Sequence, residues 1–227
     1  MIELFTAPTP NGWKVSIMLE ECGLAYRLRP IDLGRGEQRE PWFLEISPNG
    51  RIPAIRDDGF ALFESGAILH YLAEKTGRFL PEQPRRRWQV LQWLHWQVGG
   101  VGPMVGQSIS FQRYIATDVP HAKRRYANEG RRLFEVLERR LEGRDYVCDE
   151  VSIADFALFP WVRAHRWARI PLEGLERVEA WLARMRARPG VGRGLAVGVP
   201  EAEVDRWSEA RKAAYRRGGA AMVTDVD

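Results

Sequence analysis

The chain has 227 residues, of which 45% are hydrophobic and 28% charged, and its formal net charge is +4 at pH 7. This is the composition of an ordinary soluble globular protein, with enough length for one large core or two modest ones. The sequence contains no apolar run near the ~20 residues of a membrane span and no signal-peptide pattern. We therefore expect a cytoplasmic protein without a membrane partner. The basic charge is not accompanied by a recognised nucleic-acid-binding module, so we expect no nucleic-acid partner either.

The cysteines and histidines indicate neither disulfide nor metal chemistry. Cys22 and Cys148 lie far apart and form no Cys-x-x-Cys motif, which argues against both a disulfide framework and a dithiol redox pair. The four histidines are isolated and lack metal-ligand spacing. We therefore expect no bound metal.

The first 78 residues show a βαβ–α–ββα pattern. A Pro-rich turn at 7–12 separates a short apolar strand from a helix that ends before Gly23, the residue type expected just past a helix end. Turn residues at 57–59 predict a hairpin. In chain order we expect a strand at 2–5, a helix to 21, a strand at 26–33, a short helix around Trp42, the hairpin, and a helix that begins at Ser65.

The rest of the chain has a helical pattern. We divide it into a linker at 79–85, with one Gly and two Pro nearby, an all-helical domain at 86–205 and a C-terminal extension at 206–227. Trp88, Leu91, Leu94 and Val98 share one predicted helix face. A capping box at 152–155 predicts another helix start. The extension is compatible with covering a cleft or with extending the surface.

Residues 47–71 are the most informative stretch for function. A helix that starts at Ser65 offers a hydroxyl and unpaired backbone N–H groups to an anion, and the helix dipole favours negative charge there. Glu64, next to it, can pair with a cation. One spot that binds a carboxylate and an ammonium together suits an α-amino-acid head group. Taken singly, Ser65 is more often a plain cap, and Pro53 is ordinary at a strand start.

The order Ile52-Pro53, Asp57-Asp58-Gly59, Glu64-Ser65 resembles the glutathione-binding half of the glutathione transferase family. The resemblance extends to about residue 200. It implies an α+β, thioredoxin-like N-terminal domain followed by an all-α glutathione transferase C-terminal domain. It also implies that Pro53 is cis and that the backbone of Ile52 pairs with the cysteinyl part of glutathione.

The first turn of the predicted helix after residue 9 bears on the chemistry. A glutathione enzyme must lower the pKa of the glutathione thiol, because the thiolate is the nucleophile. Thr9 can offer its hydroxyl, and Asn11 its side-chain or backbone N–H, while Pro10 suits the first helical position. Many family members place a Tyr, Ser or Cys here, and this sequence does not. Thr9 is also compatible with a simple N-cap role, and the two roles can coexist.

Longer motifs are similar to those of the nu-class bacterial glutathione transferases, which are glutathione-dependent disulfide-bond oxidoreductases. They are Ala-Pro-Thr-Pro-Asn-Gly-x-Lys from Ala7 and the run from Trp93 to Met104. The resemblance implies that Thr9 and Asn11 lie near the glutathione sulfur. It implies a homodimer in which Arg125 reaches glutathione from the partner subunit, although Arg124 could take that place and a solvated surface role is the ordinary alternative. The residues implied to hold the peptide are Gln38, Arg51, Ile52, Pro53, Glu64 and Ser65.

The function that follows is glutathione-dependent disulfide reduction, with glutathione as co-substrate and no enzyme cysteine. In that class two glutathione molecules, or their disulfide, occupy one site, and the second thiol resolves a mixed disulfide. Conjugation of glutathione to an electrophile is the same-class alternative, and a non-catalytic glutathione-binding scaffold is the alternative from another class. Candidates for the apolar wall of the acceptor cleft are Trp96, Trp161 and Trp167.

Overall fold

The N-terminal domain is built on a four-stranded mixed sheet with the order β2-β1-β3-β4. The structure is a computed structural model that describes residues 1–198, 213 and 216–220. In it, β1 (Ile2–Thr6) pairs in parallel with β2 (Tyr26–Pro30) and antiparallel with β3 (Ala54–Asp57), which pairs with β4 (Phe60–Phe63). The predicted hairpin forms, with Asp58 and Gly59 both at positive φ in its two-residue turn.

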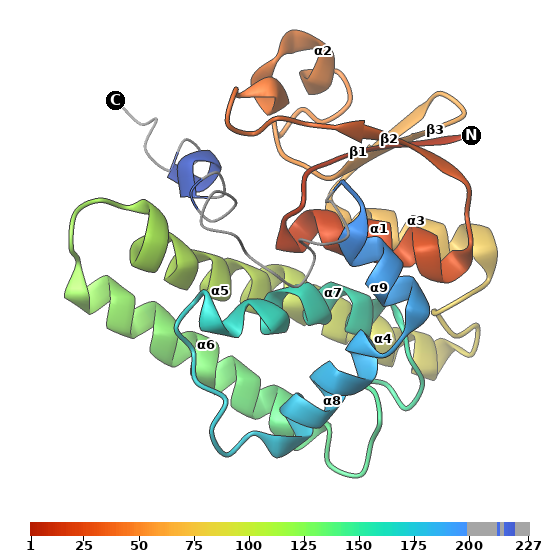
Figure 1. The fold of residues 1–227 in the computed structure, drawn as a ribbon. Coiled ribbons are helices and arrows are strands. Elements are labelled where there is room, and N and C mark those ends of the chain that lie inside the picture. Colours follow the sequence, from red (N-terminus) through yellow and green to blue (C-terminus); the bar gives the residue numbers. More distant parts are fainter. Residues whose placement is uncertain (199–212, 214–215, 221–227) are drawn as a thin grey trace.

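Helices cover both faces of this sheet (Figure 1). The helices α1 (Pro10–Cys22) and α3 (Ser65–Thr76) lie on one face, and the short helices η1 (Glu37–Arg39) and α2 (Pro41–Leu44) lie on the other. The end of α1 is set by Gly23, whose left-handed conformation lets its N–H bond back to the last turn. The predicted thioredoxin-like domain is confirmed, although β2 ends at Pro30, before the expected Leu33.

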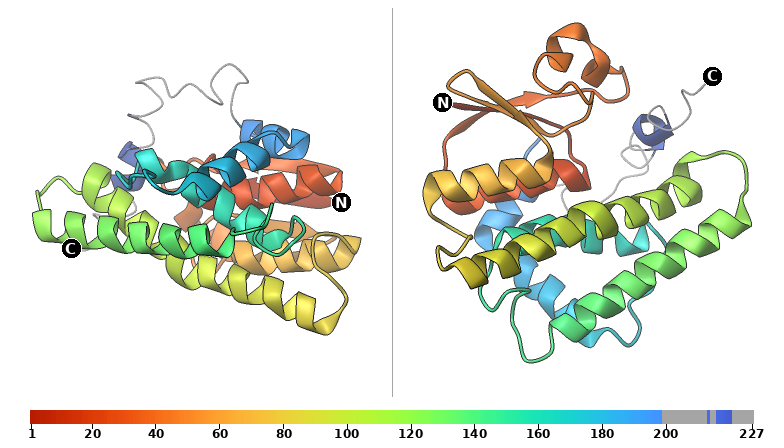
Figure 2. Two further views of the ribbon diagram at one scale, coloured as in Figure 1. Left: turned by 90° about the horizontal axis from the view of Figure 1, so that it is seen from below. Right: turned by 180° about the vertical axis from the view of Figure 1, so that it is seen from behind.

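The rest of the described chain is helical and forms the second domain (Figure 2). The helix α4 continues through a π-helical turn, η2, into α5, and a second π-helical turn, η3, ends that rod. No helix in the described ranges is long and apolar enough to cross a membrane. The elements are α4 (Pro84–Trp96), η2 (Gln97–Val101), α5 (Gly102–Ile109), η3 (Ser110–Tyr114), α6 (Pro120–Arg140), α7 (Ile153–Arg163), η4 (Ala164–Arg166), α8 (Glu176–Arg186) and α9 (Pro189–Ala196).

One apolar core joins the two domains. Its buried residues run from Ile2 and Leu4 of β1 through α1 and α3 to α7 and α9. The helix α9 lies directly on α1, where Ser16 Oγ donates to the Gly194 carbonyl at 2.7 Å. A Cβ at Gly194 would lie 2.5 Å from the Ile17 backbone, so only glycine permits this approach. The N-terminus of α1 is therefore fixed rigidly against the helical domain.

Two expectations for the helical domain have different outcomes. The capping box forms as expected: Ser152 and Asp155 bond reciprocally at the start of α7. The shared apolar face on α4 is wrong in one member, because Leu91 and Leu94 are buried whereas Trp88 is 67% exposed. Periodicity places a residue on a helix face, but it does not tell how far the neighbouring elements extend over that face. Most of the C-terminal extension lies outside the described residues.

Candidate active site

A cleft of about 490 Å³ opens where the N-terminus of α1, the loop before β3 and the start of α3 face η2 and α5. Its size falls within the range of ordinary small-molecule sites. The predicted site residues that line it are Thr9, Asn11, Gln38, Arg51, Ile52, Pro53, Glu64 and Ser65.

Thr9 is the N-cap of α1. Its backbone is extended, and its Oγ1 accepts a hydrogen bond from the Gly12 N–H at 3.2 Å. A hydroxyl that accepts this bond still has its own proton to donate. The capping role and the sulfur-donor role of Thr9 are therefore compatible in one geometry.

Asn11 is oriented by a residue of the helical domain. Trp161 on α7 donates from Nε1 to Asn11 Oδ1 at 3.0 Å. With its oxygen engaged, the Asn11 amide is left with its NH₂ group to donate. Asn11 follows Pro10 in the first turn of α1, where backbone N–H groups also lack partners within the helix. The turn thus offers several donors to a developing thiolate.

The loop from Ser47 to Pro53 presents its backbone to the cleft. Ser47 Oγ donates to the Arg51 carbonyl at 2.9 Å, and the Ile52–Pro53 peptide bond is cis, which confirms the expectation from the family resemblance. Within the described part of the chain, neither the N–H nor the C=O of Ile52 has a hydrogen-bond partner. An extended peptide can therefore pair with Ile52 as an added strand would.

Gln38 and Arg51 occupy the same end of the cleft. Gln38 is 1% exposed, and its Oε1 has no hydrogen-bond partner among the described residues. A buried acceptor without a partner is costly, so this oxygen is suited to a ligand N–H. Arg51 is exposed and donates to the neighbouring Gly50 carbonyl at 3.2 Å.

The start of α3 contains a charged residue that sequence reasoning did not assign. Ser65 is the first residue of α3, and Glu64 before it has a φ of 70°. Lys14 Nζ, on the second turn of α1, donates to Ser65 Oγ at 3.2 Å although Lys14 is only 2% exposed. Burial lowers the pKa of Lys14 to about 7, and the Glu64 carboxylate opposes that shift. The sequence signal for Lys14 was its position among apolar residues of α1.

Gln97 is a second cleft residue to which sequence reasoning gave no role. It begins the π-helical turn η2 and is fully buried, yet within the described chain neither its Oε1 nor its Nε2 has a partner. Such π-helical turns occur frequently at functional sites. Gln97 lines the side of the cleft away from the sheet, so its amide is available to a ligand there.

The open side of the cleft is apolar. Of the three tryptophans considered for this wall, only Trp161 lines the cleft; Trp167 lies under the Arg113 guanidinium and Trp96 packs edge-on against Trp93. Gly219 closes the wall against the ring of Tyr114. The described part of the C-terminal extension thus covers the cleft. The other apolar lining residues include Phe63, Val98, Pro103 and Ile109.

Comparison with known protein families assigns both domains. Residues 9–75 match the glutathione S-transferase N-terminal domain, and residues 112–189 match the glutathione S-transferase C-terminal domain. The chain is 51% identical over 203 residues to the disulfide-bond oxidoreductase YfcG of Escherichia coli, which covers 86% of this chain and 94% of YfcG. The chain belongs to the glutathione transferase family. This transferase is also 36% identical to YghU of E. coli, a disulfide-bond oxidoreductase, over 85% of this chain and 73% of YghU.

Solved structures of bacterial relatives share the fold of this transferase. A glutathione transferase from Pseudomonas putida, with one glutathione disulfide bound per subunit, superposes with a TM-score of 0.81 at 44% identity and covers 85% of this chain and 90% of its own. One from Burkholderia graminis, with two glutathione molecules bound per subunit, gives 0.81 at 43% identity over 86% and 87%.

Arg125 of this transferase lies outside the cleft. It stands on α6 in a shallow basic surface that it shares with Arg124, His121 and Arg132. Both Arg124 and Arg125 are exposed, so neither reaches the cleft of its own chain.

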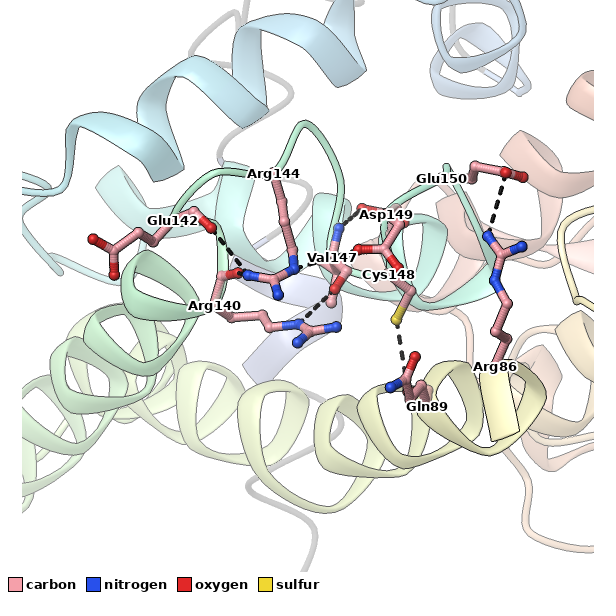
Figure 3. A network of polar contacts seen from close by, with 10 residues as sticks. Arg86, Gln89, Arg140, Glu142, Arg144, Val147, Cys148, Asp149 and Glu150 are labelled. Atoms are coloured by element: carbon pink, nitrogen blue, oxygen red, sulfur yellow. Dashed lines mark hydrogen bonds and ion pairs between the residues drawn. The ribbon is translucent and has the colours of Figure 1, made fainter. Parts of the chain in front are cut away.

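Neither cysteine of this transferase lines the cleft. Cys148 lies in a polar network between α4 and the loop after α6, where its Sγ donates to the Gln89 carbonyl at 3.6 Å (Figure 3). Burial raises the pKa of Cys148 to about 11, and burial also raises the pKa of Cys22, which contacts Thr76 at the end of α3. Both thiols therefore stay protonated and unreactive near neutral pH. Within the described residues, no group of His, Cys, Asp and Glu could hold a metal ion.

Proposed function

We propose that this glutathione transferase is a cytoplasmic disulfide reductase that uses the thiol of bound glutathione, in the manner of the nu class. The observation that carries the proposal is the donor pair at the first turn of α1, where Thr9 and Asn11 face a cleft that contains no cysteine. The 51% identity to a protein named as a disulfide-bond oxidoreductase supports the same reaction.

The cleft is suited to an extended glutathione. The γ-glutamyl carboxylate would bind at Ser65 and the first N–H groups of α3, and its ammonium would pair with Glu64. The cysteinyl backbone would pair with Ile52, which has no other partner in the described chain, and Gln38 and Arg51 would hold the glycyl end. This arrangement directs the sulfur toward Thr9 and Asn11.

The reaction then proceeds by two thiol–disulfide exchanges. The glutathione thiolate, stabilised by the Thr9 hydroxyl and the Asn11 amide, attacks one sulfur of the disulfide substrate. A mixed disulfide forms and the other substrate sulfur leaves as a thiolate, which takes up a proton. A second glutathione thiolate attacks the glutathione sulfur of the mixed disulfide, which releases the second substrate thiol. Two glutathione molecules are oxidised to their disulfide, and one disulfide is reduced to two thiols.

The bound ligands of the relatives match the two ends of this reaction. The Pseudomonas putida relative binds one glutathione disulfide per subunit, and the Burkholderia graminis relative binds two glutathione molecules. We further propose that this protein forms a homodimer in which Arg125, or its neighbour Arg124, approaches the partner subunit's glutathione. The exposed basic surface on α6 supports this assignment.

A comparison of two acceptors tests the proposal. Glutathione oxidation is measured with a small symmetrical disulfide, and conjugation is measured with an aryl halide, on the same preparation. We expect turnover of the disulfide to exceed that of the halide by a wide margin. Efficient conjugation with negligible disulfide reduction would show that the enzyme is a conjugating transferase. No binding to immobilised glutathione, with no thermal shift on adding it, would indicate a non-catalytic scaffold.

A further inference from the structure

Lys14 has no place in the reaction above, yet it is the buried cation of the cleft. Its side chain lines the cleft beside Ser65 and is 2% exposed. Among the described residues no carboxylate forms an ion pair with it, and its printed hydrogen bond is the one to Ser65 Oγ. An ammonium carries three donors, and a buried one is costly unless it is paired. Lys14 is therefore built to meet an anion that the protein itself does not supply.

The hydrogen bond to Ser65 explains how Lys14 acts. Because Lys14 Nζ donates to Ser65 Oγ at 3.2 Å, it occupies an acceptor lone pair of that hydroxyl. The hydroxyl proton of Ser65 is then directed elsewhere, and the first turn of α3 places unpaired N–H groups beside it. One ammonium, one hydroxyl proton and the end of a helix dipole thus converge on the same spot.

We propose that Lys14 is a positioning residue and the counter-ion of the carboxylate-binding end of the cleft, where it orients Ser65 as a donor and takes up a proton when the γ-glutamyl carboxylate binds. This inference rests on the proposed function and assigns Lys14 a role within it.

The electrostatic surroundings of Lys14 account for the proton uptake. In the free protein burial lowers the pKa of Lys14 to about 7, so only part of the population is charged near neutral pH. A bound carboxylate favours the charged form and raises that pKa, so binding draws a proton from solvent. Since the charged form is the one that binds, affinity falls as the pH rises above the pKa of the free protein.

The other charged groups on the elements packed against α1 are already engaged. On α9 and the residue before it, Arg193 and Arg188 pair with Glu20 and Glu21 near the C-terminal end of α1. On α7, Asp155 is bonded within the capping box, and Arg163 lies over the Trp13 ring. On α3, His70 pairs with Glu74, and Lys75 with Asp57. Glu64 is the charged group whose field acts on Lys14.

Calorimetric titration with S-methylglutathione tests the inference, because this ligand has no thiol to ionise. Titration in two buffers of different ionisation enthalpy, over roughly one pH unit either side of that pKa, gives the number of protons exchanged. We expect wild-type protein to take up a fraction of a proton per ligand. Lys14→Met should abolish the uptake and weaken binding by about ten- to a hundredfold at the acid end of the range.

Two further variants separate the charge from the hydrogen bond and from net charge. Lys14→Gln keeps a donor for Ser65 but not the titration, so it should recover part of the affinity and none of the proton uptake. Lys123→Met removes a lysine that pairs with Asp118 on the surface, and it should behave as wild type. If one Lys14 variant does not fold, the other and the wild-type uptake still decide.

The outcomes distinguish this inference from the function on which it rests. Wild-type binding with no proton uptake, or with the same uptake in Lys14→Met, would overturn the role of Lys14 and leave the proposed function intact. Wild-type protein that does not bind S-methylglutathione at all would overturn both.

Discussion

Trp161 and Asn11, 150 positions apart in the chain, are joined by a 3.0 Å hydrogen bond from the indole Nε1 to the amide Oδ1. This bond connects the helical domain to the first turn of α1. It fixes which end of the Asn11 amide faces the cleft, so the helical domain takes part in setting the donor geometry at the sulfur. The close approach of α5 to Trp161 at Gly106 holds the indole in place.

Replacing Trp161 by Phe should therefore impair the ionisation of bound glutathione. Without the indole N–H the Asn11 amide can rotate and present its oxygen to the sulfur. We expect turnover to fall by about three- to tenfold, the equivalent of one ordinary hydrogen bond. The pKa of the bound thiol, followed by the ultraviolet absorbance of the thiolate, should rise. Trp88→Phe, at an exposed position on α4, is the matched control. An unchanged thiol pKa in Trp161→Phe would remove Trp161 from the mechanism.

Thr9→Ala should reduce both stability and turnover, because Thr9 both caps α1 and donates to sulfur in our proposal. Loss of the cap costs about 1 kcal/mol of folding free energy. We expect kcat to fall more than KM for glutathione rises, since the lost donor acts chiefly on the thiolate. Thr9→Ser keeps the cap and the donor and should retain most of both properties. Wild-type turnover in a measurably destabilised Thr9→Ala would leave Thr9 with the capping role alone.

Removing both cysteines should leave disulfide reduction largely intact. Cys22→Ser and Cys148→Ala in one chain delete two thiols whose pKa values are raised and which lie outside the cleft. Glutathione supplies both reacting sulfurs in the proposed reaction. The rate of glutathione oxidation with a small disulfide, measured on protein shown to be folded, checks this. A large loss of rate in the folded double variant would mean that an enzyme thiol participates.

Much of the fold and several site contacts could be predicted because their causes are local. The hairpin follows from Asp58-Gly59, the start of α7 from its capping box, and the start of α1 from Thr9 and Pro10. Each depends on neighbours within a few positions, and a single sequence displays these directly.

The parts that sequence reasoning missed depend on contacts between distant segments. Lys14 meets Ser65 across 51 positions, and Trp161 meets Asn11 across 150. Neither side chain differs in type from many others in the chain, so only the packing of α1 against α3 and α7 reveals its role. The exposure of Trp88 was missed for the same reason, because α4 extends beyond the elements that cover its other residues.

Asp57 should make folding stability depend on pH. Lys75 donates to it at 2.7 Å and Tyr71 also at 2.7 Å, and together they lower the pKa of Asp57 below its usual value. A carboxylate whose pKa is lower in the folded state stabilises the fold above its unfolded pKa, and that contribution is lost as the pH falls through the folded pKa. Asp57→Asn should lower the melting temperature by a few degrees at neutral pH, and the difference from wild type should shrink in acid.

The adjacent Asp58 provides the control for that experiment. Its side chain is 80% exposed and lies in the hairpin turn, where Asn is tolerated. Asp58→Asn should change the melting temperature much less than Asp57→Asn. A difference between Asp57→Asn and wild type that stays constant from neutral to acid pH would contradict the ionic role of Asp57.

Gly219→Ala should change how the cleft accepts the disulfide without changing its affinity for glutathione. A Cβ at Gly219 would lie 2.5 Å from Tyr114 Cζ, so the tyrosine ring or the segment 216–220 must move. Both residues line the acceptor side of the cleft, away from Ser65 and Ile52. Gly218→Ala is the matched control, because a Cβ there meets its nearest atom at an ordinary 3.8 Å. We expect KM for the disulfide to change several-fold in Gly219→Ala, with KM for glutathione unchanged and Gly218→Ala close to wild type. Equal kinetics in the two variants would show that this contact does not shape the acceptor site.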